Sequence, residues 1–177
     1  GEHDVVVPLE ADNPLTRSND GRADPQGGFW IGTMGIDAED GAGAIYRYYR
    51  GELPQLFAPI TISNAICFAP DGQTAYFTDT PTQKILRVAL DQHGWPVGEP
   101  NVFIDLSGTE YRPDGAVVDA KGNLWNAQWG VGRVAGYDPN GNFLESFNFA
   151  ATQTSCPAFG GEDLSTLYCT SAAVGID

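Results

Sequence analysis

The chain has few positive charges and no long apolar run, and both shortages narrow its function. Of its 177 residues, nine are Lys or Arg and 23 are Asp or Glu, which gives a formal net charge of −14 at pH 7. A charge of this sign repels phosphate backbones, so we expect no nucleic-acid partner. No stretch approaches the ~20 apolar residues that cross a bilayer as a helix. We therefore expect no membrane partner either.

Histidine, cysteine and the common catalytic motifs are also scarce. His3 and His93 have no partner pattern, and GxSxG, GxGxxG and P-loop motifs are missing, so nucleophilic Ser–His catalysis has no support. The cysteines Cys67, Cys156 and Cys169 lack CxxC spacing, and their apolar or aromatic neighbours favour buried free thiols. A disulfide between Cys156 and Cys169 is the alternative.

Turn-forming residues are abundant instead. There are 22 glycines and 12 prolines, and hydrophobic residues make up 42% of the chain without a long stretch at helical spacing. That balance predicts an all-β fold with many turns. The acidic surplus is most simply a solvated surface, with a cation-holding pocket as the alternative. No signal peptide is visible and the chain opens with Gly1, so we expect a processed product or partial chain, in the cytoplasm or alternatively in the periplasm.

A plan of polar entry, turn and aromatic strand occurs four times along the chain. The copies are Arg17–Met34, Ser63–Asp79, Pro113–Ala127 and, more weakly, Cys156–Thr170. Their central aromatic residues are Trp30, Tyr76, Trp125 and Tyr168. These residues recur about every 45 positions, which is the period of β-propeller blades.

The segments between the copies supply the other strands of each blade. They read as short apolar strands at Ala44–Tyr49, Leu56–Phe57, Lys84–Leu90, Val102–Leu106, Arg133–Tyr137 and Phe143–Phe149. Turn residues at Asp91–Gly94 and Asp138–Gly141 join them as hairpins. We predict a single β-propeller domain over residues 1–177 with about four blades, and a β-sandwich is the alternative. Because unpaired blade edges would be exposed, we interpret the chain as part of a larger ring, lacking N-terminal blades and the C-terminal end.

Three oxygen-bearing side chains occupy the same place in successive copies. Asn19, Asn64 and Asp114 each lie 11 or 12 residues before the aromatic residue of their copy, just ahead of an inner strand. In a propeller such places converge on the central channel, and hard oxygen donors without His or Cys favour Ca²⁺, Mg²⁺ or Mn²⁺. Turn and strand-entry roles are the alternative. Arg17 shares a strand face with Asn19, where it suits a hydroxyl-rich ligand or else pairs with an acidic neighbour.

The four blocks resemble, in order, the senescence-marker-protein/regucalcin/gluconolactonase family of six-bladed propellers. The matching blocks are RSNDGRADPQGGFWIGTM, SNAICFAPDGQTAYFTD, YRPDGAVVDAKGNLWNAQWGVGRVAGYDPNG and FGGEDLSTLYCTSA, which cover most of Arg17–Ala172. The resemblance implies a divalent cation held by a Glu, an Asn and an Asp. The ion would be Ca²⁺, Mg²⁺, Mn²⁺ or Zn²⁺, with Ca²⁺ the one most expected in a structure.

The resemblance also implies a role for each residue of the matching motifs. Asn64 and Asp114 correspond to metal ligands, and Asp114 would also be the catalytic proton acceptor. Arg17 and Asn19 correspond to the substrate-binding pair. The family's ligand Glu precedes the first block, and Glu10 does not stand in that motif.

The implied reaction is hydrolysis of a sugar lactone to the aldonic acid, by a monomer or weak homo-oligomer. Because the ligand Glu is missing, we expect little activity from this chain alone. The alternatives are a calcium-binding propeller without catalysis and a related esterase or phosphotriesterase. The chain has Ala65 where the family pattern has Gly, and Gly28 where it usually has Arg. We expect the first change to tighten the backbone beside the metal and the second to affect a turn.

Overall fold

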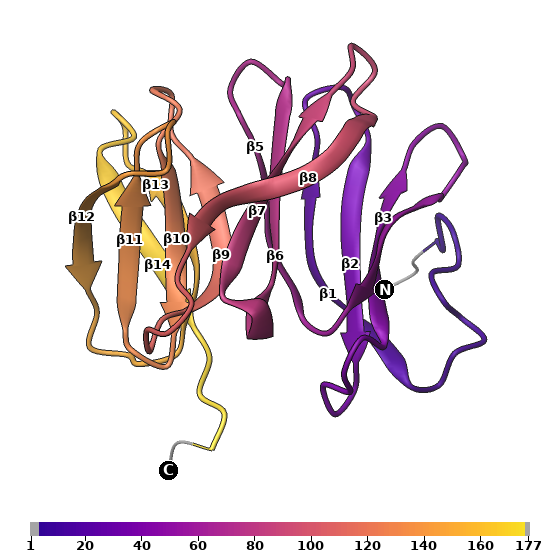
Figure 1. Cartoon of the computed structure of the whole chain (residues 1–177), viewed down its shortest axis with the longest axis horizontal. Coiled ribbons are helices and arrows are strands. Elements are labelled where there is room, and N and C mark those ends of the chain that lie inside the picture. Colours follow the sequence, from indigo (N-terminus) through magenta and orange to yellow (C-terminus); the bar gives the residue numbers. More distant parts are fainter. Residues whose placement is uncertain (1–3, 176–177) are drawn as a thin grey trace.

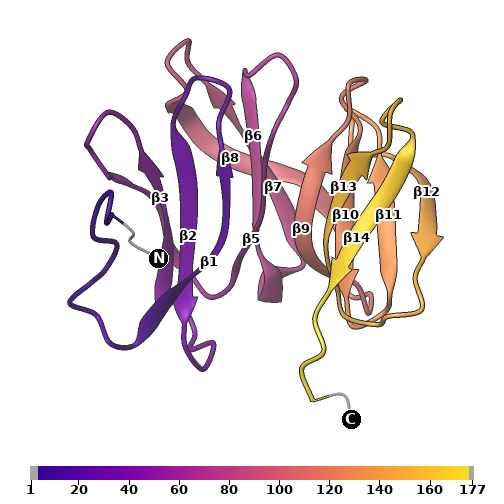
Figure 2. The same cartoon turned by 180° about the vertical axis from the view of Figure 1, so that it is seen from behind.

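The computed structural model describes residues 4–175 as antiparallel sheets with one short helix (Figure 1 and Figure 2). The expectation for His3 lies outside the described residues. The first sheet contains β1 (Thr16–Ala23), β2 (Phe29–Gly35), β3 (Gly43–Tyr48) and β4 (Gln55–Ile60). The second contains β5 (Ser63–Phe68), β6 (Thr74–Asp79), β7 (Lys84–Leu90) and β8 (Pro96–Asp105).

The remaining strands form two further sheets. The third sheet contains β9 (Arg112–Val118), β10 (Leu124–Trp129), β11 (Arg133–Tyr137) and β12 (Phe143–Asn148). The fourth, within the part of the chain described, contains β13 (Thr154–Gly160) and β14 (Thr166–Ser171). The 3₁₀ helix η1 (Thr80–Thr82) joins β6 to β7. No helix in residues 4–175 is long and apolar enough to cross a membrane.

The sheets are arranged as propeller blades. In each four-stranded sheet the strands lie side by side in chain order, and the first strands β1, β5, β9 and β13 contact one another in succession. Each sheet therefore extends outward from a common line of inner strands, as both views show (Figure 1 and Figure 2). The prediction of an all-β, partial β-propeller is confirmed. We refer to the four sheets as blades 1 to 4.

Most predicted strands lie where the apolar pattern puts them. Lys84–Leu90 and Arg133–Tyr137 are strands with those bounds, and the outer strand of blade 2 is longer than the predicted Val102–Leu106. The expected hairpin turns are confirmed, because Gly94 N–H donates to Asp91 O at 3.0 Å and Gly141 N–H donates to Asp138 O at 2.9 Å.

The hydrophobic core lies between neighbouring blades. Side chains of blades 1 and 2 share one cluster that includes the fully buried Trp30 and Ile66. Blades 2 and 3 share a second cluster around Cys67 and Tyr76, and a third cluster contains Trp125. The repeated aromatic residues therefore act as inter-blade packing residues. Their equivalent in blade 4, Tyr168, is 57% exposed.

The described cysteines are unpaired, as the spacing favoured. The expected burial is confirmed for Cys67 but is wrong for Cys156 and Cys169, which are half-buried on the paired strands β13 and β14. Burial raises the pKa of the Cys67 thiol far above its usual range. A buried neutral thiol behaves as a small apolar side chain, so Cys67 belongs to the core.

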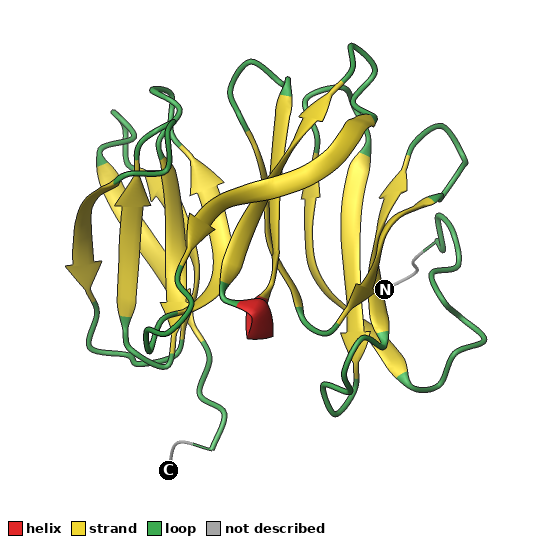
Figure 3. Cartoon of the chain, in the orientation of Figure 1, coloured by secondary structure: helices red, strands yellow, loops and turns green. Residues whose placement is uncertain are grey.

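The two ends of the blades differ. At the end we call the turn end, tight turns connect β1 to β2, β5 to β6 and β9 to β10. At the opposite end, which we call the pocket end, the inner strands β1, β5 and β9 begin. The helix η1 also lies there, drawn in red at the lower end of the central strands in Figure 3.

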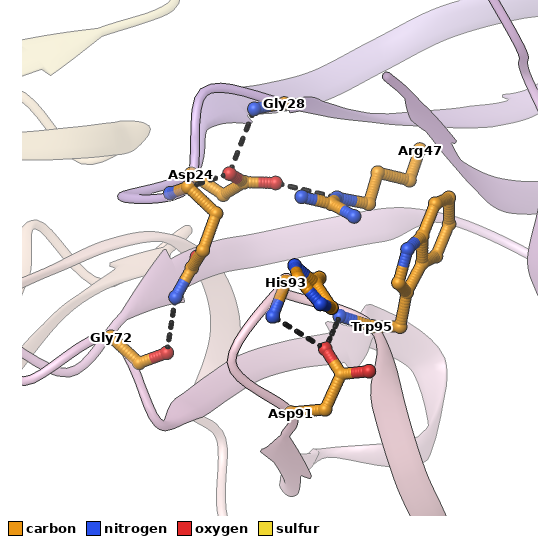
Figure 4. A network of polar contacts seen from close by, with 8 residues as sticks. Asp24, Gly28, Arg47, Gly72, Asp91, His93 and Trp95 are labelled. Carbon is orange, nitrogen blue, oxygen red and sulfur yellow. Dashed lines mark hydrogen bonds and ion pairs between the residues drawn. The ribbon is translucent and has the colours of Figure 1, made fainter. Parts of the chain in front are cut away.

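A buried polar network ties blades 1 and 2 together at the turn end (Figure 4). Arg47 Nε lies 2.6 Å from Asp24 Oδ2, and both side chains are fully buried. The guanidinium also stacks on the Trp95 ring of blade 2, with Cζ 4.3 Å from the ring centroid. A Cβ atom at Gly28 would stand 2.5 Å from Asp24 Oδ2 and 2.7 Å from Arg47 Nε, so this pair leaves no room for a side chain there.

Candidate functional site

A cavity of about 1150 Å³ opens at the pocket end, and all four residues singled out in the sequence line it. Arg17 and Asn19 come from blade 1, Asn64 from blade 2 and Asp114 from blade 3. These residues are far apart in the sequence, but they come together in the structure because each lies near the start of an inner strand. A smaller cavity of about 540 Å³, at the turn end, contains none of them.

Register shifts in the pairing of the inner strands change the direction of these side chains. The pairing of β1 with β2 shifts register between Ser18 and Gly21, and that of β5 with β6 shifts between Asn64 and Cys67. The pairing of β9 with β10 shifts at the residues that surround Asp114. A bulge places two residues opposite one and turns a side chain away from the regular alternation. The same irregularity in three blades thus directs Asn19, Asn64 and Asp114 to one place.

Asp114 is half-buried and lacks a positive partner. Burial raises the pKa of its carboxyl to about 7, and the nearby negative charge of Asp20 adds to the rise. Burial raises the pKa of Asp20 as well. Neither carboxylate forms an ion pair within residues 4–175. Of the two, Asp114 lines the cavity, and a carboxylate with a raised pKa in a cavity is a candidate group for binding a cation.

Asn64 is held by hydrogen bonds at both ends of its amide. Its Oδ1 accepts a bond from Asn19 Nδ2 at 3.2 Å, and its Nδ2 donates to Thr80 Oγ1 at 2.9 Å. The Thr80 hydroxyl in turn donates to the Pro113 carbonyl at 2.8 Å, immediately before Asp114. These contacts link blades 1, 2 and 3 through side chains that all face the pocket end.

Arg17 and Asn19 lie on the same side of β1, as their spacing indicates. Arg17 Nη1 donates to Asn19 Oδ1 at 3.1 Å and to the Ser18 carbonyl at 3.0 Å. Asn19 Nδ2 also donates to the Ser63 carbonyl at 2.8 Å. Arg17 is exposed at the pocket, so its remaining N–H groups are available to a ligand.

Several residues that line the cavity were missed from the sequence, and so were Asp20 and Arg22, which lie outside the cavity lining on the same inner strand as Asn19. Asp20 Oδ2 accepts the Ile66 N–H at 2.8 Å, and Arg22 donates to the Ile66 carbonyl at 2.9 Å and the Ala116 carbonyl at 3.1 Å. Asp20 stands in the first matched block, so its neighbours in the motif signalled it. Further residues that line the cavity are Gln83, Glu110, Arg112 and Trp129. Nothing in their spacing marks them, because they come from loops and from strand ends.

The structure shows the backbone conformation of Ala65 and the contacts of Glu10, two residues at which the sequence was compared with the family pattern. Ala65, where the family pattern has Gly, adopts a φ of +55°, a left-handed conformation that favours glycine. Glu10 lies outside the cavity lining and accepts bonds from Thr33 at 2.9 Å and Tyr46 at 2.7 Å. Burial and this carboxylate raise the pKa of the Tyr46 hydroxyl to about 12. Glu10 therefore serves the packing of blade 1.

The residues at the pocket fit a hard divalent cation. They supply the carboxylate of Asp114 and the amide oxygen of Asn64, and the half-buried Asp114 forms no ion pair within residues 4–175. Within residues 4–175 no group of three or more His, Cys, Asp and Glu side chains is placed to bind a metal. The donor set is therefore oxygen-based and mixed, which suits Ca²⁺, Mg²⁺ or Mn²⁺ better than a zinc thiolate site.

The strand order and the cavity define a partial β-propeller with a pocket where its inner strands begin. Residues 1–173 match the family model described as the SMP-30/Gluconolactonase/LRE-like region. The chain belongs to this family. The resemblance seen in the four sequence blocks is thereby confirmed.

Two curated relatives and one solved structure show how similar this chain is to known members of the family. A 6-deoxy-6-sulfogluconolactonase of Pseudomonas putida is 38% identical over 167 residues, covering 92% of this chain and 57% of that relative. An L-arabinolactonase of Azospirillum brasilense is 38% identical over 175 residues, covering 97% and 57%. The crystal structure of a calcium-binding protein, regucalcin, from Agrobacterium tumefaciens matches with a TM-score of 0.94 and 49% identity, covering 98% and 59%. The chain thus spans somewhat more than half the length of these relatives.

Proposed function

We propose that the protein hydrolyses a sugar lactone to the aldonic acid with the help of a divalent cation. The observation that carries the proposal is the convergence of Arg17, Asn19, Asn64 and Asp114 from three blades on one cavity. The names of the relatives, a sulfogluconolactonase and an arabinolactonase, support the same class of reaction. A calcium-binding relative of 49% identity supports Ca²⁺ as a cation for the site.

The residues divide the work of ester hydrolysis between them. Asn64 and Asp114 would hold the cation. When bound, the cation supplies Lewis-acid polarisation of the lactone carbonyl and offsets the negative charge that develops on its oxygen. Asp114, with a pKa of about 7 in the unliganded chain, also suits the role of proton acceptor from the attacking water near neutral pH. The water adds to the carbonyl carbon, the ring C–O bond breaks, and the proton taken up by Asp114 passes to the ring oxygen, which becomes a hydroxyl group of the aldonic acid.

Arg17 and Asn19 would orient the sugar. Arg17 is tied to Asn19 Oδ1 by one nitrogen and keeps other N–H donors toward the cavity. Guanidinium donors match hydroxyl and carbonyl oxygens, and an arginine fixed at one corner loses less conformational freedom on binding. We therefore assign the pair to substrate binding, with their largest effect expected on KM.

The test compares Asp114→Ala with Asp71→Ala in the complete gene product that contains these 177 residues. Asp71 is an exposed turn-end residue whose carboxylate bonds only the Gln73 N–H, at 2.9 Å, among the described contacts. Hydrolysis of a panel of sugar lactones, aryl esters and phosphotriesters is measured with EDTA and after adding Ca²⁺, Mg²⁺ or Mn²⁺. We expect EDTA and Asp114→Ala to lower lactone turnover at least about 100-fold, and Asp71→Ala to leave it unchanged.

Each other outcome removes part of the proposal. Turnover that is indifferent to EDTA and retained in Asp114→Ala would eliminate the metal-dependent mechanism. Turnover of aryl esters or phosphotriesters but not lactones would identify the related esterase class. Tight cation binding without hydrolysis of any member of the panel would identify a calcium-binding propeller without catalysis.

A further inference from the structure

Asn64 can serve a cation with only one end of its side chain. The amide oxygen is a ligand for hard cations, whereas the amide nitrogen carries two protons and repels them. A half-turn of the side-chain amide exchanges the two ends. Because Asn64 is only 6% exposed, its orientation is determined by its neighbours in the protein.

The backbone carbonyl of Pro113 fixes this orientation from one side. A carbonyl oxygen accepts hydrogen bonds and cannot donate, so the Thr80 hydroxyl, 2.8 Å away, gives its single proton to Pro113. Thr80 Oγ1 can then only accept from its second neighbour. The end of Asn64 that lies 2.9 Å from Thr80 Oγ1 is therefore the NH₂ group.

A second carbonyl fixes the same orientation from the other side. Asn19 lies 2.8 Å from the Ser63 carbonyl, so the end of Asn19 that faces Ser63 is its NH₂ group. The same nitrogen lies 3.2 Å from Asn64, which consequently presents its oxygen there. Two independent acceptors, Ser63 O and Pro113 O, thus select one direction for every bond in this row of side chains.

We propose that Thr80 is a positioning residue of the cation site: it binds the NH₂ group of Asn64 and so leaves Asn64 Oδ1, on the Asn19 side, as the end that a cation can reach. The proposal rests on the cation of the proposed function. Thr80 also joins Asn64 of blade 2 to the residue before Asp114 of blade 3. It therefore sets the spacing of the two ligands as well as the orientation of one. Partners of this kind commonly change metal affinity about 10–100-fold.

The local structure makes Thr80 suited to this task. It begins the helix η1, where its N–H donates to Ile62 O at 3.0 Å and its carbonyl accepts from Gln83 N–H at 3.0 Å. Its side chain is β-branched, so few rotamers are open to it, and it is 9% exposed. The backbone bonds and the restricted rotamer therefore fix the position of the Thr80 hydroxyl, and its low exposure limits competition from bulk water.

The test uses Thr80→Val, which keeps the shape and removes the hydroxyl, and Thr80→Ser, which restores a hydroxyl. Thr78→Val is the matched control, because Thr78 is a buried threonine two residues earlier whose hydroxyl bonds a backbone carbonyl, Lys84 O, at 2.7 Å. The affinity for Ca²⁺ and Mn²⁺ is measured by calorimetric titration of the complete gene product. We expect Thr80→Val to bind about 10–100-fold more weakly, and Thr80→Ser and Thr78→Val to bind within about threefold of the parent.

A spectroscopic readout tests the orientation without any metal. In the EDTA-treated protein, the side-chain NH₂ protons of Asn64 give a pair of amide signals, identified by their loss in Asn64→Asp. One of these protons is bonded to Thr80 Oγ1, so we expect its chemical shift to move in Thr80→Val and to stay in Thr80→Ser and Thr78→Val. Unfolding in urea with EDTA present separates these local effects from a general loss of stability.

Two results would overturn the proposal. One is equal cation affinity in the parent and Thr80→Val, in a protein that binds cations and hydrolyses lactones; the proposed function would then stand and this inference alone would fail. The other is a loss in Thr80→Ser as large as in Thr80→Val, since the hydroxyl would then not be the cause. A parent protein that binds no cation at all would remove both this inference and the metal of the proposed function.

Discussion

Aspartate side chains behave differently at the two ends of the blades. At the turn end, Asp91 Oδ1 accepts N–H bonds from His93 and Trp95, both at 2.9 Å, and these bonds hold the pKa of Asp91 below its usual range. Asp138 is bonded in the same way to Asn142 and Asn140, and its pKa is lowered too. At the pocket end, burial raises the pKa of Asp114 to about 7.

The difference shows how one residue type serves structure in one place and chemistry in another. Turn-end carboxylates accept hydrogen bonds from backbone N–H groups of their own turns, so they do not need a ligand to satisfy them. Asp20 and Asp114 lie at bulges of the inner strands, and neither forms an ion pair within residues 4–175. An unbalanced negative charge beside a cavity is therefore the better sign of function than the presence of an Asp.

The largest effect is expected from replacing Arg47, the positively charged side chain of the turn-end network. Arg47→Met would leave the Asp24 carboxylate buried without its partner, 2.6 Å away in the parent. Breaking one partner of a buried ion pair costs about 3–5 kcal/mol, so we expect a loss of that size in the free energy of unfolding by urea. Because the network lies at the turn end, cation affinity at the pocket end is expected to stay unchanged.

A double variant provides the control for this prediction. Asp24→Asn combined with Arg47→Met removes both charges but keeps an oxygen that accepts the Gly28 N–H, bonded at 2.8 Å in the parent. We expect it to be more stable than Arg47→Met alone. A double variant that is less stable than the single one would mean that packing on the rings of Tyr49 and Trp95, and not charge, makes Arg47 necessary.

The fold was open to prediction because its signals are local and repeated. Apolar runs, Asp–Gly turns and an aromatic residue about every 45 positions each indicate a strand or a turn without reference to the rest of the chain. The arrangement of blades then follows from the repeat. The exposure of Tyr168 did not follow, since burial depends on which sheet lies on the next face.

The site was open to prediction only in part. Counting from the aromatic residues placed Asn19, Asn64 and Asp114 in register, and the structure brings them to one cavity. Thr80 and Arg22 were not found, because they matter through contacts to the carbonyls of other blades, namely Pro113 O, Ile66 O and Ala116 O. A bond to a backbone carbonyl leaves no pattern in the sequence at the accepting residue, so only the folded chain reveals it.

A smaller effect on the free energy of unfolding is expected for Asp114→Asn, and at high pH the substitution should stabilise the folded protein. The folded-state pKa of Asp114 is about 7, above the usual 3.8 of the unfolded chain, so the folded state binds the proton more tightly. Its contribution to stability is therefore complete below about pH 4 and is lost as the pH rises through 7. In EDTA at pH 8 we expect Asp114→Asn to be more stable than the parent by about 2–4 kcal/mol, and at pH 4 to be equal to it.

The cation and a turn-end aspartate supply the controls. A saturating cation stabilises the parent by mass action and should reverse the order of the two proteins at pH 8. Asp138→Asn should show the opposite pH dependence, because the pKa of Asp138 is lowered by its bonds to Asn142 and Asn140. Identical slopes of unfolding free energy against pH for Asp114→Asn and the parent would show that Asp114 is not the buried acid described here.

The smallest effect concerns backbone strain, in which the two ends also differ. Among the residues near the pocket, Ala65 adopts a φ of +55° directly after Asn64, a conformation that Gly27 and Gly141 of the turn end adopt as glycines. A left-handed alanine costs about 1–2 kcal/mol. Replacing Ala65 by Gly removes that cost, but it also loses one buried methyl group, about 0.8 kcal/mol, and makes the unfolded chain more flexible, about 0.4–1 kcal/mol. These terms nearly cancel.

We therefore expect Ala65→Gly to change the free energy of unfolding by less than about 0.8 kcal/mol in either direction. Ala75→Gly is the matched control, because Ala75 is equally buried in the same blade and has an ordinary strand conformation, so only the losses remain there. It should cost about 1–2 kcal/mol. Equal losses in both variants would show that Ala65 stores no strain. The expected difference would show that the strained residue lies beside Asn64, where the chain departs from regular pairing to aim an amide oxygen at the pocket.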